Sequence, residues 1–287
     1  MTRIAVAPAP GRSVLRVRSD RLAVRVLHQD QDGARVALVA NGALLLAGDA
    51  VEIEVDVAEG AWLEIVETTG TVAYGGAAAS RWDVDVRLGE AATLVWDALP
   101  FVVSDGARTH RRTDVHLGES ARALLRETFV LGRARQAGGD LWTHSLVQDA
   151  GGPLHVEELD LSGQVRGLPG VLAVHGSPGL VDGGPAASIR APRTLSVLDT
   201  VLALGWRPAA VPGTPPAPAT STGQDASATC FELDRPGTVL RWLGTELHED
   251  TIGDRYLALW ERELTDERRR TGASVGPASP ALVPVPA

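Results

Sequence analysis

Paired carboxylates are the residues of this chain whose types and spacing come nearest to those of a reactive site. Three such pairs occur: Glu52 with Glu54, Asp83 with Asp85, and Glu157 with Glu158. The first two pairs are two residues apart in strand-like runs, so the members of each pair share one face. Such a face is either a solvated outer surface or an acidic lining along which a hydrated divalent metal ion could pass.

Glu157 and Glu158 would suit a glycosidase only if both carboxyl groups faced one cleft, about 5 Å or 6.5–9.5 Å apart. Adjacent residues on a strand point to opposite faces, so this pair alone cannot form such a site. A β-rich hydrolase that acts on carbohydrates through paired carboxylates is an alternative that needs further partners for these residues.

The absence of lysine excludes several common catalytic sites, because all 27 basic residues are arginine. A Walker A phosphate loop, a pyridoxal Schiff base and the SxxK hydrolases each require a lysine. Ser177, in HGSPG, lacks the first glycine of a GxSxG nucleophile elbow and favours a turn. Cys230 is the only cysteine, so the chain alone can form neither a disulfide nor a cysteine-cluster metal site.

The charge of the chain argues against general nucleic-acid binding, because the net charge is −9 and the pI is about 5.3. No window reaches about 18 uninterrupted apolar residues, so no membrane span is expected. The first residues, MTRIAVAPAPGRS, show no secretory signal. We therefore expect a cytoplasmic protein.

Short runs that alternate apolar and polar residues predict a β-rich chain. They lie at Ser13–Ser19, Leu22–His28, Ala34–Ala40 and Val51–Val57. A strand–turn–strand unit then recurs from Val55, Val86 and Val115, at steps of 31 and 29 residues. Repeats of this length are typical of stacked units, so we expect layered or solenoid-like sheets. Three independent hairpins are the alternative.

The segment Arg126–Trp142, RETFVLGRARQAGGDLW, mixes charged residues with glycines. Its apolar spacing alone would allow a helix, but its register with the repeat places Leu124–Gly132 on a strand, as its Thr, Phe and Val residues favour. Gly132, Arg133 and Asp140 then frame a turn at the edge of a sheet.

Residues 1–270 are expected to form a single β domain, with a Pro/Ala/Gly-rich insertion at 207–228. One helix is predicted over Gly253–Arg270, where apolar residues follow helical spacing. The tail at 271–287 is predicted to be disordered. The predicted fold class is mainly β, with layered sheets, solenoid-like repeated strand units and one C-terminal helix.

The chain resembles the family of urease accessory proteins called UreD, or UreH, from about Arg12 to Arg270. Four stretches carry the resemblance: Leu44–Tyr74 (LLLAGDAVEIEVDVAEGAWLEIVETTGTVAY), Leu94–Leu117 (LVWDALPFVVSDGARTHRRTDVHL), Arg126–Trp142, and TVLRWLG with LALW near the C-terminus. The resemblance implies two layers of mixed β-sheets and a role other than catalysis.

That role would be a scaffold or chaperone for urease maturation. UreD-like proteins dock on apo-urease and bind UreF, which recruits the GTPase UreG, and the assembly delivers nickel to urease. The resemblance implies no tightly bound cofactor, a transient passage of nickel through a water-filled path, and no nucleic-acid or membrane partner. A generic oligomerising β scaffold is a further alternative.

Seven residues are candidates for partner contacts or for the nickel path: Asp49, Tyr74, Arg111, Glu127, Gly132, Arg133 and Asp140. None of them is expected to be catalytic or to form a stable metal site. In a purely structural interpretation, Asp49 and Asp140 stabilise turns and Glu127 pairs with an arginine.

Overall fold

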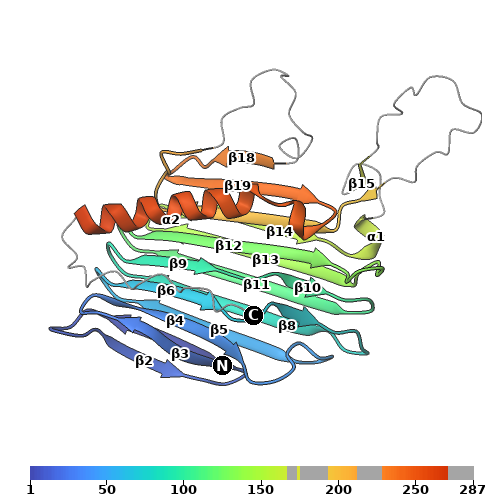
Figure 1. Ribbon diagram of the computed structural model, residues 1–287, viewed down its shortest axis with the longest axis horizontal. Coiled ribbons are helices and arrows are strands. Elements are labelled where there is room, and N and C mark those ends of the chain that lie inside the picture. Colours follow the sequence, from blue (N-terminus) through green and yellow to red (C-terminus); the bar gives the residue numbers. More distant parts are fainter. Residues whose placement is uncertain (167–172, 175–192, 212–227, 271–287) are drawn as a thin grey trace, which may run out of the picture.

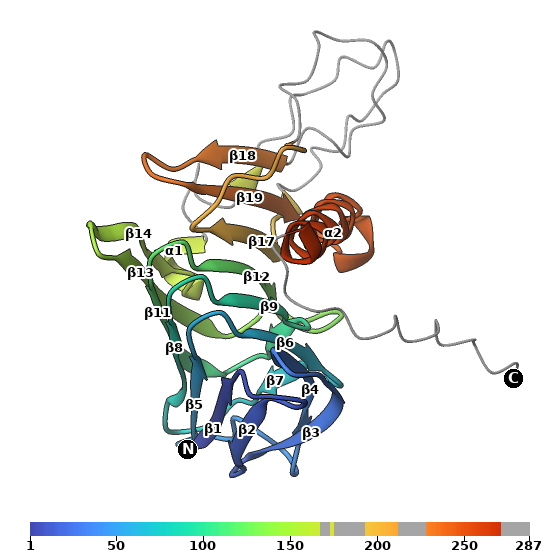
Figure 2. The same cartoon turned by 90° about the vertical axis from the view of Figure 1, so that its left-hand side faces the viewer.

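The computed structural model describes residues 1–166, 173–174, 193–211 and 228–270, which form a sandwich of two β-sheets with one long helix outside it (Figures 1 and 2). The predicted tail at 271–287, Ser177 and most of the predicted insertion at 207–228 lie outside the described residues. The mainly β fold class is confirmed.

The seven-stranded sheet has the order β14-β13-β11-β8-β5-β1-β2 in the described part of the chain. Its strands are β1 (Thr2–Ala7), β2 (Val14–Arg18), β5 (Ala50–Val57), β8 (Ser80–Leu88), β11 (Arg108–Leu117), β13 (Asp140–Asp149) and β14 (Gly152–Asp160).

The ten-stranded sheet has the order β18-β19-β17-β12-β9-β6-β4-β3, with β7 and β10 extending from β12. Its strands are β3 (Leu22–Gln29), β4 (Gly33–Ala40), β6 (Trp62–Glu67), β7 (Thr71–Ala73), β9 (Thr93–Asp97), β10 (Phe101–Val103), β12 (Arg122–Leu131), β17 (Val197–Leu204), β18 (Ala228–Glu232) and β19 (Gly237–Gly244). The two-residue strands β15 (Ala173–Val174) and β16 (Arg193–Thr194) pair with each other.

The strands of the sequence repeat pass alternately through the two sheets, which makes the middle of the chain a solenoid. β5, β8 and β11 are parallel neighbours in the seven-stranded sheet, while β6, β9 and β12 are parallel neighbours in the ten-stranded sheet. Val55, Val86 and Val115 are direct register partners, so the predicted repeat is confirmed residue by residue. Strands joined by the tight turn lie in different sheets, which rules out independent hairpins.

The tight turn keeps a left-handed residue at the same place in each coil. Gly60, Ala91 and Ser120 have φ values of 67°, 53° and 56°. This conformation costs a non-glycine residue about 1–2 kcal/mol. Hydrogen bonds between the coils offset that cost, since Gly60 N donates to Glu90 O and Ala91 N donates to Glu119 O, each at 2.8 Å.

Two hydrophobic cores hold the three layers together. The larger core fills the space between the sheets, and the smaller one lies between the ten-stranded sheet and α2 (Ile252–Arg270). The predicted helix is confirmed, and its residues Leu257, Trp260 and Leu264 are buried against the sheet. The short helices α1 (Gly163–Arg166) and η2 (Leu247–Glu249) lie in connections between these elements.

Candidate functional site

A buried ion pair lies between the two sheets, where a hydrophobic core would be expected. Arg111 of β11 and Glu127 of β12 both point into the sandwich, and their side chains are 9% and 12% exposed. Glu127 Oε1 accepts hydrogen bonds from Arg111 Nε at 3.2 Å, from Arg111 Nη2 at 2.8 Å and from Thr113 Oγ1 at 3.0 Å. The carboxylate is therefore held in place by three donors on the opposite sheet.

Three aromatic rings surround the guanidinium group of Arg111. Its central carbon lies 5.7 Å from the ring centroid of Trp82, 5.3 Å from that of Phe101 and 5.5 Å from that of Phe129. The negative face of an aromatic ring attracts a cation at such distances. The rings and Glu127 together compensate a positive charge that has little access to water.

Glu67, at the end of β6, is a second interior carboxylate and was not among the predicted site residues. It accepts hydrogen bonds from Trp96 Nε1 and from Leu99 N, both at 3.1 Å. Burial raises the pKa of Glu67 to about 7, although the charge of Arg111 and these hydrogen bonds oppose the rise. Glu67 therefore changes its charge near neutral pH.

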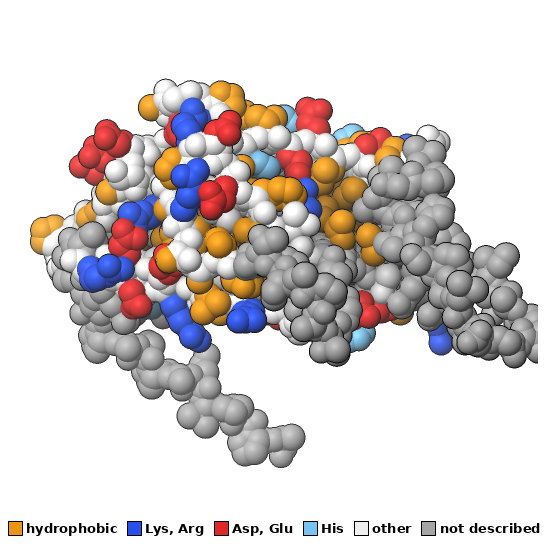
Figure 3. Space-filling model, turned by 90° about the horizontal axis from the view of Figure 1, so that it is seen from above, with side chains coloured by type: hydrophobic (Ala, Val, Ile, Leu, Met, Phe, Trp, Pro, Cys, Tyr) orange, Lys and Arg blue, Asp and Glu red, His pale blue; other side chains and the backbone are white. Residues whose placement is uncertain are grey.

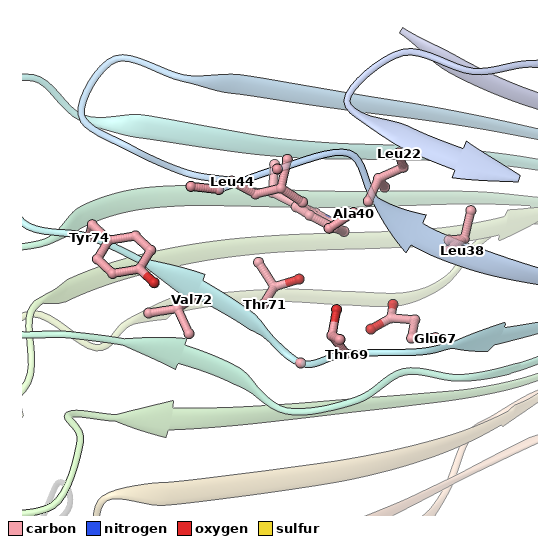
Figure 4. Close-up of a pocket in the computed structure, with 13 residues that line it drawn as sticks. Leu22, Leu38, Ala40, Leu44, Glu67, Thr69, Thr71, Val72 and Tyr74 are labelled. Atoms are coloured by element: carbon pink, nitrogen blue, oxygen red, sulfur yellow. The ribbon is translucent and has the colours of Figure 1, made fainter.

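Glu67 lines two cavities of the sandwich, and the larger one reaches the surface at the exposed residues Thr69 and Tyr74. The larger, about 140 Å³, has Tyr74, Thr69, Thr71 and Leu44 among its lining residues (Figure 4). The smaller, about 10 Å³, has room for about one water and is lined by Arg111 and Glu127. Glu67, Thr71 and Trp82 line both cavities, so polar groups lead from Tyr74 to the buried ion pair.

Polar residues continue through the interior beyond this pair. Glu127 is paired across the sheet with Thr200, and Thr200 with Arg241. Arg241 Nη1 and Nη2 each donate to a carboxylate oxygen of Glu157 at 2.7 Å, which ties β19 to β14 across the sandwich. The neighbouring His155 has a lowered pKa, mainly because it is buried.

The carboxylate pairs of the sequence do not form a hydrolytic site. Glu157 binds Arg241 inside the sandwich, whereas Glu158 lies on the outer face beside His144, with 3.2 Å between Oε1 and Nδ1. The opposite orientation predicted for these neighbours is confirmed. Glu52 and Asp83 lie on the outer face of the seven-stranded sheet, 3.9 Å and 3.6 Å from Arg81 Nη2, so the acidic-lining interpretation of these two pairs is wrong.

Tyr74, Gly132 and Arg133 meet at one edge of the solenoid, where the connections that follow β7, β10 and β12 lie side by side. The central guanidinium carbon of Arg133 lies 5.1 Å from the ring centroid of Tyr74. Gly132 has φ 99°, and a Cβ atom there would come within 2.8 Å of Gln136 O. Glycine is therefore needed to form this turn, which presents Arg133 beside a residue of the larger cavity.

Asp49 and Asp140 line neither cavity described above and instead stabilise turns. Asp49 Oδ2 accepts a hydrogen bond from Leu46 N at 3.1 Å, and its Oδ1 lies 3.0 Å from Arg21 Nη2. Asp140 Oδ1 accepts a hydrogen bond from Gly163 N at 2.8 Å. These contacts match the structural interpretation of the two aspartates.

Arg126 forms a second charged network, on the opposite side of β12 and under α2. Its Nε lies 3.0 Å from Asp199 Oδ1, its Nη2 3.4 Å from Asp250 Oδ2 and its Nη1 2.6 Å from Asp254 Oδ1. Asp199 is fully buried, and that burial raises its pKa against the opposing charge of Arg126. Asp250 Oδ1 also accepts a hydrogen bond from Gly253 N at 2.9 Å, so the network anchors the start of α2.

Replacing Glu67 with glutamine is expected to make unfolding less dependent on pH. The folded pKa of Glu67 is raised above its unfolded value of about 4.3. Protonated Glu67 therefore favours the folded state at low pH, and this contribution is lost as the pH rises to about 7. Urea unfolding measures the free energy of unfolding of both proteins. The difference, variant minus wild type, should rise by about 2 kcal/mol between about pH 5 and about pH 8.

The exposed Glu59, replaced with glutamine, provides the control and should follow wild type at each pH. If the free energies of the Glu67→Gln variant and of wild type changed in parallel with pH, Glu67 would have an ordinary pKa.

Among the described residues, no group of three or more His, Cys, Asp or Glu side chains is arranged to hold a metal ion. No helix in that part of the chain is both long and apolar enough to cross a membrane.

Comparison with known proteins connects this architecture to one family. A family model described as UreD urease accessory protein matches residues 1–270. Urease accessory protein UreD 1 of Streptomyces griseus is 39% identical over 229 residues, which cover 78% of this chain and 76% of that protein. Urease accessory protein UreD of Parafrankia sp. is 34% identical over 232 residues, covering 71% and 77% respectively. These names describe an accessory protein rather than an enzyme.

Proposed function

Since this chain belongs to the UreD family of urease accessory proteins, we propose that it is a cytoplasmic scaffold that binds apo-urease and the UreF–UreG complex and helps to deliver nickel to urease. A role in urease maturation follows from the family. The specific partners, the cytoplasmic location and the nickel path are our proposal.

The observation that carries the nickel path is the line of polar groups that runs from the surface at Tyr74 into the sandwich. Thr69, Thr71 and Glu67 lead from the cavity residue Tyr74 toward Glu127. Burying carboxylates in a β-sandwich is costly, and stability alone gives little reason to keep them there. Carboxylate and hydroxyl oxygens are hard ligands that can contact a hydrated divalent ion in succession. Glu127 also neutralises Arg111, so that the pair presents little net charge to a passing cation.

Deleting the gene tests the proposed function most directly. The urease of the deletion strain, grown with nickel in the medium, is expected to contain little nickel and to show little activity. Reintroducing the gene should restore both, which controls for effects on neighbouring genes. Urease with a normal nickel content in the deletion strain would contradict the proposal.

Replacing Arg133 with alanine is expected to weaken complex assembly or urease activation while the fold remains intact. Arg133 is exposed and its side chain contacts Tyr74, so its loss leaves the buried core unchanged. The free energy of unfolding of the Arg133→Ala variant should differ from that of wild type by less than about 0.5 kcal/mol. Co-purification with urease and UreF, together with urease activity, measures the effect, and Arg255→Ala on α2 is the matched exposed control. Wild-type assembly and activation by the Arg133 variant would exclude this residue from the site.

A further inference from the structure

The two sheets end beside each other in edge strands that leave part of the interior open. β2 is the last strand of the seven-stranded sheet and β3 the last strand of the ten-stranded sheet, and Figure 2 shows both at the end of the sandwich that holds the N-terminus. Val17 of β2 pairs with Ile4, and Val26 of β3 pairs with Val36. Ile4 and Val36 are fully buried, whereas Val17 is 41% and Val26 47% exposed. One more strand would cover the exposed valines.

The same two strands concentrate positive charge on an otherwise acidic protein. Residues 12–29 contain five arginines and one aspartate, Asp20, which binds the N-terminal amine of Met1. Arg16, Arg18 and Arg25 are exposed, and among the described residues no carboxylate lies within 4.0 Å of them. On the face in Figure 3, by contrast, arginine and acidic side chains are interspersed. The charge of β2 and β3 is therefore available to a partner.

We propose that β2 accepts an extended strand of a partner protein in which acidic residues alternate with apolar ones. Arg16 and Arg18 are two residues apart and point to the outer face of the sheet, opposite to that of Leu15 and Val17. A strand added to the free backbone edge of β2 would follow the same alternation. Its acidic side chains would lie beside the two arginines, and its apolar side chains would cover Val17 and Val26.

The charge of β2 also distinguishes this occupant from a second copy of the chain. Pairing two β2 strands would bring arginines of both copies together, and like charges opposite each other destabilise a sheet. Charged residues on edge strands commonly prevent edge-to-edge association. Arginines prevent pairing with neutral or basic strands but attract an acidic one, so the edge would select its partner by charge.

A labelled peptide of about eight residues that alternates glutamate and valine is the probe for this edge. The full-length protein is expected to bind it, and fluorescence anisotropy should show that added salt weakens the binding. The Arg16→Glu/Arg18→Glu variant should bind it at least about tenfold more weakly. Arg255→Glu/Arg262→Glu on α2 makes the same change in net charge on another exposed surface and should retain binding.

Three further measurements test the charge, the strand pairing and the fold in turn. A peptide with lysine in place of glutamate should not bind, and N-methylation of alternate backbone amides in the acidic peptide should abolish binding. Circular dichroism should show that the arginine variants remain folded. Absence of binding by the acidic peptide, equal binding by both double variants, or undiminished binding of the N-methylated peptide would overturn the proposal. So would a concentration-dependent dimer that the Arg16→Glu/Arg18→Glu variant no longer forms.

Discussion

Replacing Arg111 with alanine is expected to lower the free energy of unfolding by about 3–5 kcal/mol. The substitution leaves Glu127 buried without its main partner and removes the cation from among Trp82, Phe101 and Phe129. Urea or guanidinium denaturation would measure the loss. Arg3→Ala is the control, because Arg3 pairs with Asp56 at 2.7 Å but is half exposed, and its replacement should lower the free energy of unfolding far less.

Replacing both partners separates the stability of the pair from its function. The free energy of unfolding of the Arg111→Leu/Glu127→Leu variant should lie within about 1 kcal/mol of the wild-type value or exceed it. The reason is that apolar residues can replace a buried ion pair without leaving an unpaired charge. Nickel delivery to urease should nevertheless fall, since the Glu127 oxygens are lost. Full activation of urease by this stable variant would show that the pair serves structure alone. If the Arg111→Ala variant lost less than about 1 kcal/mol of its free energy of unfolding, burial of an unpaired Glu127 would not be costly.

Replacing Arg126 with alanine is expected to release the start of α2 and to lower the free energy of unfolding by about 3–5 kcal/mol near pH 8. Asp199 would remain fully buried, and Asp250 nearly so, without their cation. Protonation of Asp199 would remove the cost of its buried, unpaired negative charge. The pKa of Asp199 is already raised by burial and would rise further without Arg126. A raised carboxyl pKa favours the folded state at low pH, so the loss should be smaller near pH 5 than near pH 8.

Hydrogen exchange of the α2 amides and urea unfolding at the two pH values measure these effects. Faster exchange should be concentrated in the first turns of α2, where Asp250 accepts the hydrogen bond from Gly253. Arg122→Ala is the control, because Arg122 also joins β12 to α2, through Glu267, but both side chains are partly exposed. Its cost should stay below about 1 kcal/mol. If the Arg126→Ala variant lost the same free energy of unfolding near pH 5 as near pH 8, the buried aspartates would not titrate between these pH values.

Much of the solenoid could be predicted from sequence, because its residues obey local rules. The alternation of apolar and polar residues predicted β2 to β5, and the repeat placed Val55, Val86 and Val115 in register. β17 could not be found by alternation, since it lies between two cores and is buried at every position.

The interior carboxylates follow the same rule of alternation. Leu63 and Ile65 face inward on β6, so Glu67 had to face inward as well. That signal was present in WLEIVE, but no partner of Glu67 could be named, because Trp96 and Leu99 lie about 30 residues further along the chain. The Arg126 network is still less local, since Asp199 and Asp250 come from β17 and the start of α2, 73 and 124 residues away.

The number of repeated solenoid turns sets the length of this protein along the solenoid axis. Each turn of the chain uses 29 or 31 residues and advances the molecule by one spacing between strands, about 4.8 Å. Removing an odd number of residues from a strand would move the side chains that follow to the opposite face, whereas removing a whole turn of the solenoid would leave the alternation intact. The length of the solenoid, and with it the distance that its interior spans, therefore changes in steps of one complete turn.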